Sequence, residues 1–350
     1  MAAGVTRIAR DIAFTLEKKS TKIFENIFLN NGVLAALGMK GRVKIVRGGD
    51  QFHERVHLGQ NSTVGHRNKF TQIPTDMQNN FRTAKYGQAV VSGAAVLNLV
   101  EEDQNAGEQK ISDMAEALVE EAQLTFPNKV AEALMKATST SVDPESIVER
   151  IEATAFGAQT SSLGGIARSS YASLPGAWQN QYNADALADL GAAAGIALFS
   201  KFLWTCSPGG AALSEQPDVV LTTTGVYAKA TGGGDANRRY SVNDRMLKLG
   251  FTNIQINNAA ILADANVTNA GYAYAINTNY LRMQILAGSK TKTIGSVKTI
   301  GDGKQSIQLQ IRPPIESDDY LNFVIKMYMV YNLTFGGLRQ HGLKTTITEA

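Results

Sequence analysis

The pentapeptide His53-Glu54-Arg55-Val56-His57 fits the HExxH pattern of zinc hydrolases. That chemistry needs a helix, because only a helix turns two histidines four residues apart toward one zinc ion, with the glutamate beside the bound water. Here Gly48-Gly49 precedes the motif and Gly59 follows it, which favours a strand that runs into a loop. Residues four apart in a strand lie about 13 Å from each other, too far to share one ion. We therefore expect no metal site here and keep the zinc hydrolase only as an alternative.

The other residues that could support chemistry have ordinary structural explanations. Gly232-Gly233-Gly234 lacks the GK[ST] that completes a phosphate-binding loop, so it predicts an exposed loop tip. His341 lies far along the chain from the other three histidines and is expected on the surface. Cys206 is the only cysteine of the sequence, so no intrachain disulfide can form, and a small buried apolar residue is expected. We expect no catalytic residue, no metal and no cofactor, in a protein that is not an enzyme.

The composition bounds the size of the core and the class of partner. The chain has 350 residues, 44% of them hydrophobic, which predicts two lobes or one lobe with long extensions. The net charge of +3 gives no general argument for nucleic-acid binding. However, residues 1–90 hold 14 basic and 6 acidic side chains, whereas residues 91–160 hold 4 and 13. This polarity favours head-to-tail association of identical chains, and DNA binding by the basic arm stays open as a second alternative.

Nothing in the sequence predicts export or a membrane span. Arg7, Arg10 and Asp11 interrupt the apolar runs at the N-terminus, where a signal peptide would have a long uncharged core. The longest apolar stretch, residues 191–203, is shorter than the roughly 20 residues that cross a membrane and contains Lys201. We expect a soluble protein that stays in the cell that makes it.

The N-terminal half predicts helices on both sides of an extended segment. Residues 10–38 predict an amphipathic helix pair. Residues 43–86 carry short alternating apolar runs among glycines, which predict a long β-hairpin or projecting loop with too few apolar residues for its own core. A long acidic helix follows, kinked at Pro127, and a second helix is expected to start with Asp143 as its N-cap. We expect the hairpin to stay flexible until another chain covers it.

After Gly164-Gly165, predicted helices alternate with strands without the regular repeat of a doubly wound sheet. Helices are expected over residues 185–203 and 242–249, and strands over residues 219–223, 251–256, 273–277, 280–285, 306–311 and 323–332. The fold class is therefore α+β.

Four short passages, taken in order, resemble one known family. They are Gly164-Gly165-Ile166-Ala167-Arg168-Ser169-Ser170-Tyr171 with Trp178, Pro217-Asp218-Val219-Val220-Leu221-Thr222-Thr223 with Tyr227, Gly250-Phe251-Thr252-Asn253-Ile254 through Asp264, and Gly271-Tyr272-Ala273-Tyr274-Ala275-Ile276-Asn277-Thr278. They are similar to the GGIxRxxY…W, PDxIxTxxxxY, GFxxIxFxGxxVxxD and lnTxyL passages of tailed-phage major capsid proteins with the HK97-type fold. The order of the predicted elements resembles the same family over nearly the whole chain.

The resemblance implies an HK97-like arrangement of parts. These are an N-terminal arm (1–45), an E-loop β-hairpin (46–88), a P-domain (89–141 and 318–350) with a long spine helix at about 106–137, and an A-domain of mixed sheet and helices (142–317).

The resemblance also implies the function and the partners. The chain is expected to assemble with itself, as pentamers and hexamers, into the icosahedral head shell around phage double-stranded DNA, after synthesis in the host bacterial cytoplasm. The implied partners are a portal, a separate scaffolding protein and the packaged DNA, contacted non-specifically at the inner surface.

The expected contacts between subunits pair the basic hairpin of one copy with the acidic helix of the next. Three of the hairpin residues, Val56, Leu58 and Phe70, are expected to become buried against neighbours. The full set of candidate contact residues is Arg47, Arg55, Val56, Leu58, Arg67, Lys69, Phe70, Glu116, Glu120 and Glu121.

Overall fold

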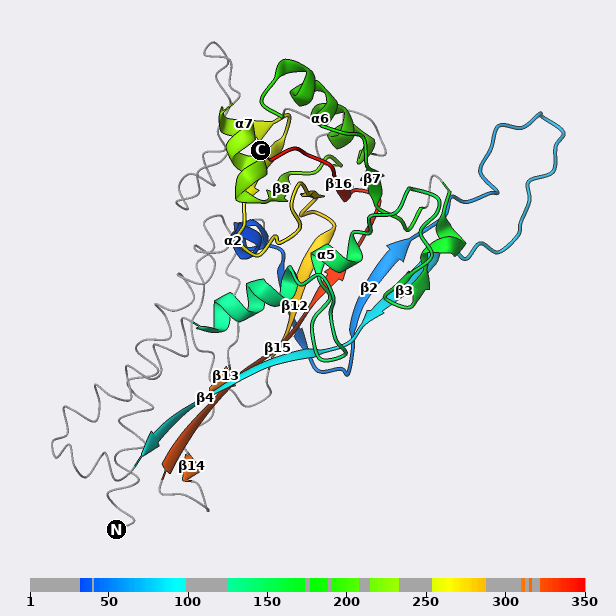
Figure 1. The fold of residues 1–350 in the computed structure, drawn as a ribbon. Coiled ribbons are helices and arrows are strands. Elements are labelled where there is room, and N and C mark those ends of the chain that lie inside the picture. Colours follow the sequence, from blue (N-terminus) through cyan, green and yellow to red (C-terminus); the bar gives the residue numbers. More distant parts are fainter. Residues whose placement is uncertain are drawn as a thin grey trace.

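The structure is a computed structural model that combines helices with two mixed β-sheets (Figure 1). It describes residues 32–39, 41–98, 125–173, 177–187, 190–207, 215–232, 254–287, 310–311, 315–316 and 322–349. Within these residues, no helix has the length and apolar character to span a bilayer. The architecture agrees with the predicted α+β class.

The first sheet is organised around the long strand β15 (Asn322–Phe335). β15 pairs antiparallel with β12 (Leu281–Ala287) at one end and with β4 (Ala89–Asn98) along most of its length. β1 (Val43–Arg47) adds to β12 in parallel, and the short strands β13 (Gln310–Ile311) and β14 (Ile315–Glu316) also pair with β15. The ribbon formed by β4 and β15 extends from the body at the lower left of Figure 1.

The second sheet contains, in order, β7 (Gln181–Asn183), β16 (Gly342–Lys344), β11 (Ala273–Ile276), β8 (Val219–Thr222), β10 (Ala259–Ala263) and β9 (Ile254–Ile256). β8 is buried along its whole length, as its run of apolar residues requires. Leu221 packs into the cluster beneath the sheet, whereas Val220 packs into the cluster beneath α6 and α7. Because successive side chains of a strand point to opposite faces of the sheet, β8 contributes to both hydrophobic clusters.

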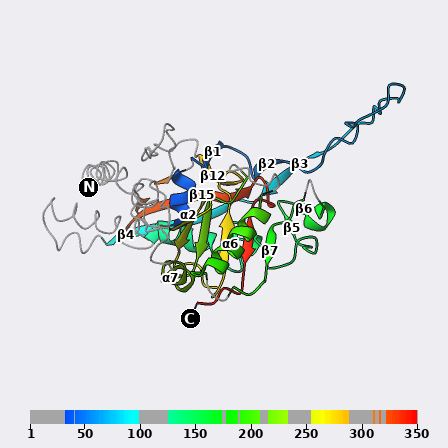
Figure 2. The same ribbon diagram turned by 90° about the horizontal axis from the view of Figure 1, so that it is seen from above.

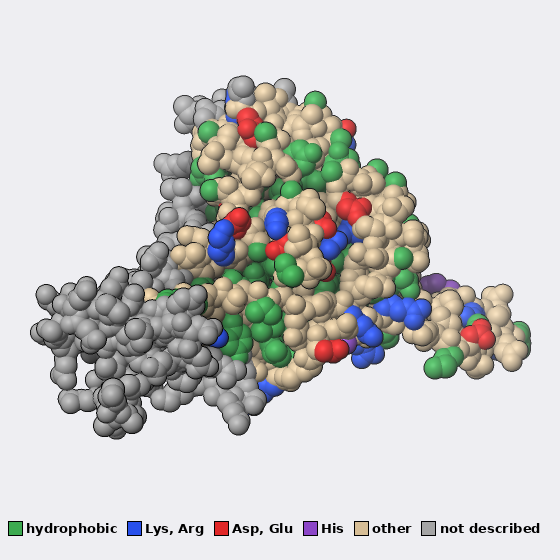
Figure 3. All heavy atoms as spheres, turned by 60° about the horizontal axis from the view of Figure 1, so that its bottom comes forward, with side chains coloured by type: hydrophobic (Ala, Val, Ile, Leu, Met, Phe, Trp, Pro, Cys, Tyr) green, Lys and Arg blue, Asp and Glu red, His purple; other side chains and the backbone are tan. Residues whose placement is uncertain are grey.

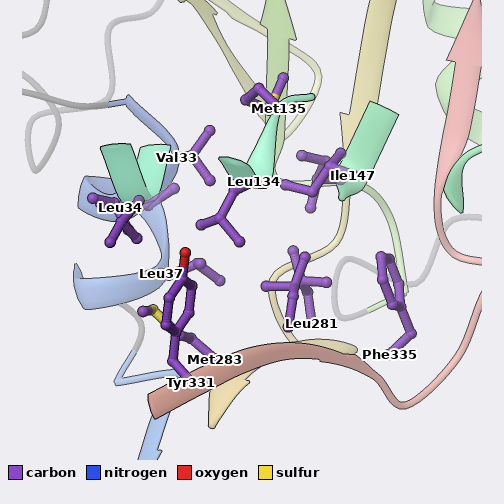
Figure 4. Packing of buried hydrophobic residues seen from close by; sticks show 14 of the residues in the cluster. Val33, Leu34, Leu37, Leu134, Met135, Ile147, Leu281, Met283, Tyr331 and Phe335 are labelled. Atoms are coloured by element: carbon purple, nitrogen blue, oxygen red, sulfur yellow. The ribbon is translucent and has the colours of Figure 1, made fainter. Parts of the chain in front are cut away.

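Helices cover both sheets. α6 (Ala193–Thr205) and α7 (Thr224–Gly232) contribute Phe199, Phe202 and Val226 to the cluster on the second sheet. α2 (Gly32–Met39), the helical residues 125–134 and α5 (Ile147–Arg150) surround the larger cluster. Figure 4 shows Leu34, Leu37 and Leu134 packed above Leu281, Met283 and Tyr331 of the first sheet. This cluster joins the two sheets into one body.

Strands β2 (Phe52–His57) and β3 (Phe81–Tyr86) form an antiparallel hairpin in the register Phe52 to Tyr86. The loop of residues 59–79 between the two strands extends far beyond the body, which Figure 2 shows from above. A short hairpin of β5 (Ser162–Leu163) and β6 (Ile166–Ala167), followed by the 3₁₀-helix η1 (Arg168–Tyr171), lies beside the hairpin base. Of the hairpin predicted over residues 43–86, the part from Phe52 to Tyr86 is confirmed, whereas Val43–Arg47 form β1 and pair with β12 of the first sheet.

Several predicted elements have different bounds. Asp143 does not cap a helix, because Ser146 accepts the Val148 N–H and α5 begins after it, whereas Asp143 accepts hydrogen bonds from Thr140 and Lys136. The helix predicted at 185–203 begins only at Ala193. The strands predicted at 219–223, 273–277, 280–285 and 323–332 are present within a few residues. β4 was not predicted.

Two predicted single-residue environments have opposite outcomes. Cys206 is fully buried, as expected, and its burial raises the pKa of the thiol to about 12. His341 was expected on the surface, and this prediction is wrong. The imidazole is fully buried, its Nδ1 accepts the Asn277 N–H at 3.3 Å, and its ring meets Phe335 edge-on. The histidine is buried because residues 336–341 connect the two sheets.

The sheets cross the expected domain boundary near residue 317. β12, expected in the A-domain, pairs with β15, and β16, expected in the P-domain, lies in the second sheet. The domain limits therefore remain a prediction. The helix predicted at 242–249, residues 10–31 of the helix pair and residues 106–124 of the acidic helix lie outside the described residues.

Candidate assembly surface

The HExxH residues form strand β2 rather than a helix. His53, Arg55 and His57 point outward and are exposed, whereas Glu54 and Val56 point inward and are buried. The predicted strand is confirmed, and a strand keeps imidazoles four residues apart too far from each other for one ion. The zinc-hydrolase alternative is therefore not supported by the geometry. Within the described residues, no three His, Cys, Asp or Glu side chains are grouped to hold a metal.

Glu54 has a structural partner inside the molecule. Its carboxylate accepts hydrogen bonds from Nη1 of Arg282 at 2.6 Å and from Nε2 of Gln284 at 3.2 Å. Both partners lie on β12, so the ion pair connects the hairpin to the first sheet. The glutamate of the motif is thus turned away from the two histidines.

The hairpin root, defined as β2 and β3, is fixed to the body on several sides. The Tyr86 hydroxyl donates to the Phe335 carbonyl at 3.0 Å and accepts the Phe335 N–H at 3.2 Å. Burial raises the pKa of this phenol well above its usual range. The Lys85 N–H donates to the Gly164 carbonyl at 2.9 Å. The root is therefore an integral part of the fold.

Val56 and Leu58 are 3% and 6% exposed and belong to the main hydrophobic cluster of the chain itself. The prediction that these two side chains become buried only against neighbouring subunits is wrong. The prediction rested on the low apolar content of residues 46–88, which is too small for a separate core. The inward face of β2 does not need one, because it packs on the body of the same chain.

The hairpin tip, defined as residues 59–79, has contacts of another kind. It forms local hydrogen bonds, such as Ser62 Oγ to Gln78 Oε1 at 3.1 Å and the Thr63 N–H to Asn61 Oδ1 at 2.9 Å. Phe70 and Met77 are 91% and 97% exposed. Val64 and Ile73 are also large exposed apolar residues of the tip, and sequence reasoning had missed them together with Met77. The sequence feature that could have identified these three residues is a large apolar side chain within a run of polar and turn-forming residues.

The basic residues predicted to contact a neighbouring subunit lie partly on the hairpin root and partly on the tip. Arg55 lies on the root, with its guanidinium 4.4 Å from the ring centroid of Phe81, and Arg67 and Lys69 lie exposed on the tip. Figure 3 shows Lys and Arg side chains along this projecting part of the surface. Arg47 is exposed at the end of β1.

The acidic partners predicted for these cations are Glu116, Glu120 and Glu121. All three lie outside the described residues. The charge pairing between subunits therefore remains a prediction.

No family model matches the chain, and no curated protein matches it.

Solved structures do match over most of their length. The chain resembles the cyanophage A-1(L) capsid asymmetric unit at 16% identity and a TM-score of 0.62, over 90% of this chain and 93% of that one. The chain has a phage capsid fold. The capsid of an empty GTA particle matches with a TM-score of 0.53 at 9% identity, over 89% and 90% of the two chains. A Mycobacterium phage Bobi structure matches with 0.50 at 12% identity, over 89% and 91%.

This capsid fold agrees with the fold class that the sequence resemblance implied. At these identities the likeness concerns the fold.

Proposed function

We propose that the chain is the major capsid protein of a tailed phage and assembles into an icosahedral shell around double-stranded DNA. The observation that carries this proposal is the fold match, which covers nine tenths of both chains. A second observation supports it: Phe70 and Met77 at the hairpin tip are almost fully exposed in the single chain, as expected of residues that another subunit covers.

Pentamers and hexamers form when the hairpin of one copy lies across the next copy. In this proposal the hairpin is the E-loop, and its tip rather than its root meets the neighbour, because the tip hydrogen-bonds within itself whereas the root is bonded to Phe335 of the body. Arg55, Arg67 and Lys69 then face the acidic segment around Glu116 and Glu120 of that copy.

The remaining parts of the shell are supplied by other molecules. A separate scaffolding protein guides assembly, a portal occupies one vertex, and the packaged DNA contacts the inner surface without sequence specificity. These partners follow from the proposed function rather than from particular residues of the chain.

Expression of the full chain with and without its neighbouring gene products, followed by electron microscopy, tests the assembly. Closed shells or capsomers are expected. The proposal fails if the chain stays monomeric under every condition and the source particle contains a different shell protein.

Charge reversal tests how the subunits meet. Replacing Arg55, Arg67 and Lys69 by Glu should reduce the yield of assembled particles much more than it changes the unfolding midpoint of the single chain. The matched control reverses three cations remote from the hairpin, Lys201, Lys229 and Lys326, with the same change of net charge. Equal loss of assembly in both variants would contradict the proposed contact.

A further inference from the structure

Lys344 is a buried lysine, with only 2% of its surface exposed. It lies on β16, and the parallel register of β16 with β7 places it directly beside Asn183. Its Nζ donates hydrogen bonds to Oδ1 of Asn183 and to the backbone carbonyl of Asp185. The amine of a buried lysine therefore lies against the carboxamide of an asparagine.

The surroundings of this pair favour reaction between the two groups. Burial lowers the pKa of Lys344, which favours the neutral amine, the nucleophilic form. On the other side of the carboxamide, Nδ2 of Asn183 donates to the Asp185 carboxylate at 2.8 Å. Asn183 is thus held between a nucleophile at its carbonyl and a carboxylate at its amide nitrogen.

The strand pairing holds the two residues in this position. The Thr345 N–H donates to the Asn183 carbonyl at 3.1 Å, and the Thr346 hydroxyl donates to the Ala184 carbonyl at 3.0 Å. Fixing two reacting groups at contact distance removes much of the entropic part of a barrier.

We propose that Lys344 and Asn183 join in an intramolecular isopeptide bond. The Nζ lone pair attacks Cγ of Asn183, a new Cγ–Nζ bond forms, and the Cγ–Nδ2 bond breaks. One proton leaves Nζ, passes through the Asp185 carboxylate and reaches Nδ2, which departs as ammonia. The step is an amide exchange, so it requires no oxidant, metal or cofactor. This inference is independent of the proposed shell function.

The bond would close a covalent ring from residue 183 to residue 344. It would tie the edge strand β7 to β16 and hold the end of the chain in the second sheet. A cross-link across so long a segment stabilises the fold by restricting the unfolded chain.

Intact-mass measurement of the purified, denatured full chain tests the bond. The wild-type mass should fall short of the sequence mass by one ammonia, and digestion should release a branched peptide that joins residues 183 and 344. Lys344→Arg and Asn183→Ser should show no deficit. Lys326→Arg, which removes an exposed lysine, should keep the full deficit as the matched control.

Two further variants separate chemistry from folding. Asn183→Asp can form the same bond with loss of water, so its product should have the mass of the wild-type product. Asp185→Asn should slow the appearance of the deficit, because the proton carrier is lost. A wild-type chain that is folded, by circular dichroism, and shows the full sequence mass after prolonged incubation would overturn the proposal. This readout comes from the single chain, so it does not depend on whether shells form.

Discussion

The Glu54 carboxylate lies 2.6 Å from Nη1 of Arg282, and this ion pair fastens the hairpin root to the first sheet. The glutamate is mostly buried, and Gln284 donates a second hydrogen bond to it. A residue that the HExxH pattern assigns to catalysis therefore has a structural role. Loss of one partner of such a pair leaves polar groups of the other without an acceptor.

We expect Glu54→Ala to lower the free energy of unfolding by roughly 1–3 kcal/mol, toward the lower end because Arg282 is partly exposed and screened by water. Urea unfolding of the single chain measures the loss. The control is Asp50→Ala, which removes an exposed carboxylate just before β2 and should change stability by less than about 0.5 kcal/mol. Equal losses in the two variants would show that the ion pair does not matter.

The hairpin shows which features could be predicted from sequence. The strand and loop around residue 53 follow from alternation and glycine placement, and the structure has both. The role of the inward face could not be predicted, because alternation shows that Val56 and Leu58 share a face but not what that face packs against.

Other features could not be predicted because they depend on contacts between residues that are far apart in the sequence. The buried position of His341 depends on residues 336–341 passing between two sheets, which no local pattern records. The isolated Asp-Pro at 143–144 suggested a helix start, but Asp143 instead accepts bonds from Thr140 and Lys136. Local signals thus predicted the element types better than their ends or their partners.

Val56→Ala and Phe70→Ala should separate folding from assembly. Val56→Ala removes buried methyl groups and should destabilise the single chain by roughly 1–3 kcal/mol. Phe70 makes no comparable buried contact, so Phe70→Ala should change stability by less than about 0.5 kcal/mol and yet reduce assembly. Urea unfolding and analytical ultracentrifugation provide the two readouts. Phe70→Ala assembling like the wild type would exclude Phe70 from the contact.

His341 should make the fold sensitive to acid. Burial lowers its pKa from 6.5 to about 4, so the unfolded chain binds a proton at a higher pH than the folded chain does. The stability contributed by the neutral imidazole is complete above about pH 6.5 and is lost as the pH falls toward 4, by roughly 3 kcal/mol in total.

Urea unfolding between pH 7.5 and 4 measures this dependence. His341→Gln should be less stable than the wild type at pH 7.5 and should lose stability less steeply on acidification. His66→Gln, which changes an exposed histidine of the tip, should keep the wild-type slope. A wild-type slope in His341→Gln would assign the acid sensitivity to other groups.

Gly164 and Gly165 form a matched pair for testing how closely the β5–β6 turn packs against the hairpin root. Both have positive φ, +60° and +75°, which strains any residue with a Cβ. At Gly164 an added Cβ would lie 2.7 Å from the Cβ of Ala84, whereas at Gly165 it would meet nothing within 4 Å.

We expect Gly165→Ala to cost only the backbone strain, roughly 1 kcal/mol, and Gly164→Ala to cost clearly more, because β3 must also move away from the turn. Thermal unfolding of the two variants gives the difference directly. Since Lys85 donates its N–H to the Gly164 carbonyl, hydrogen exchange at Lys85 should accelerate in Gly164→Ala and not in Gly165→Ala. Equal destabilisation with unchanged exchange at Lys85 would mean that the turn does not clamp the root.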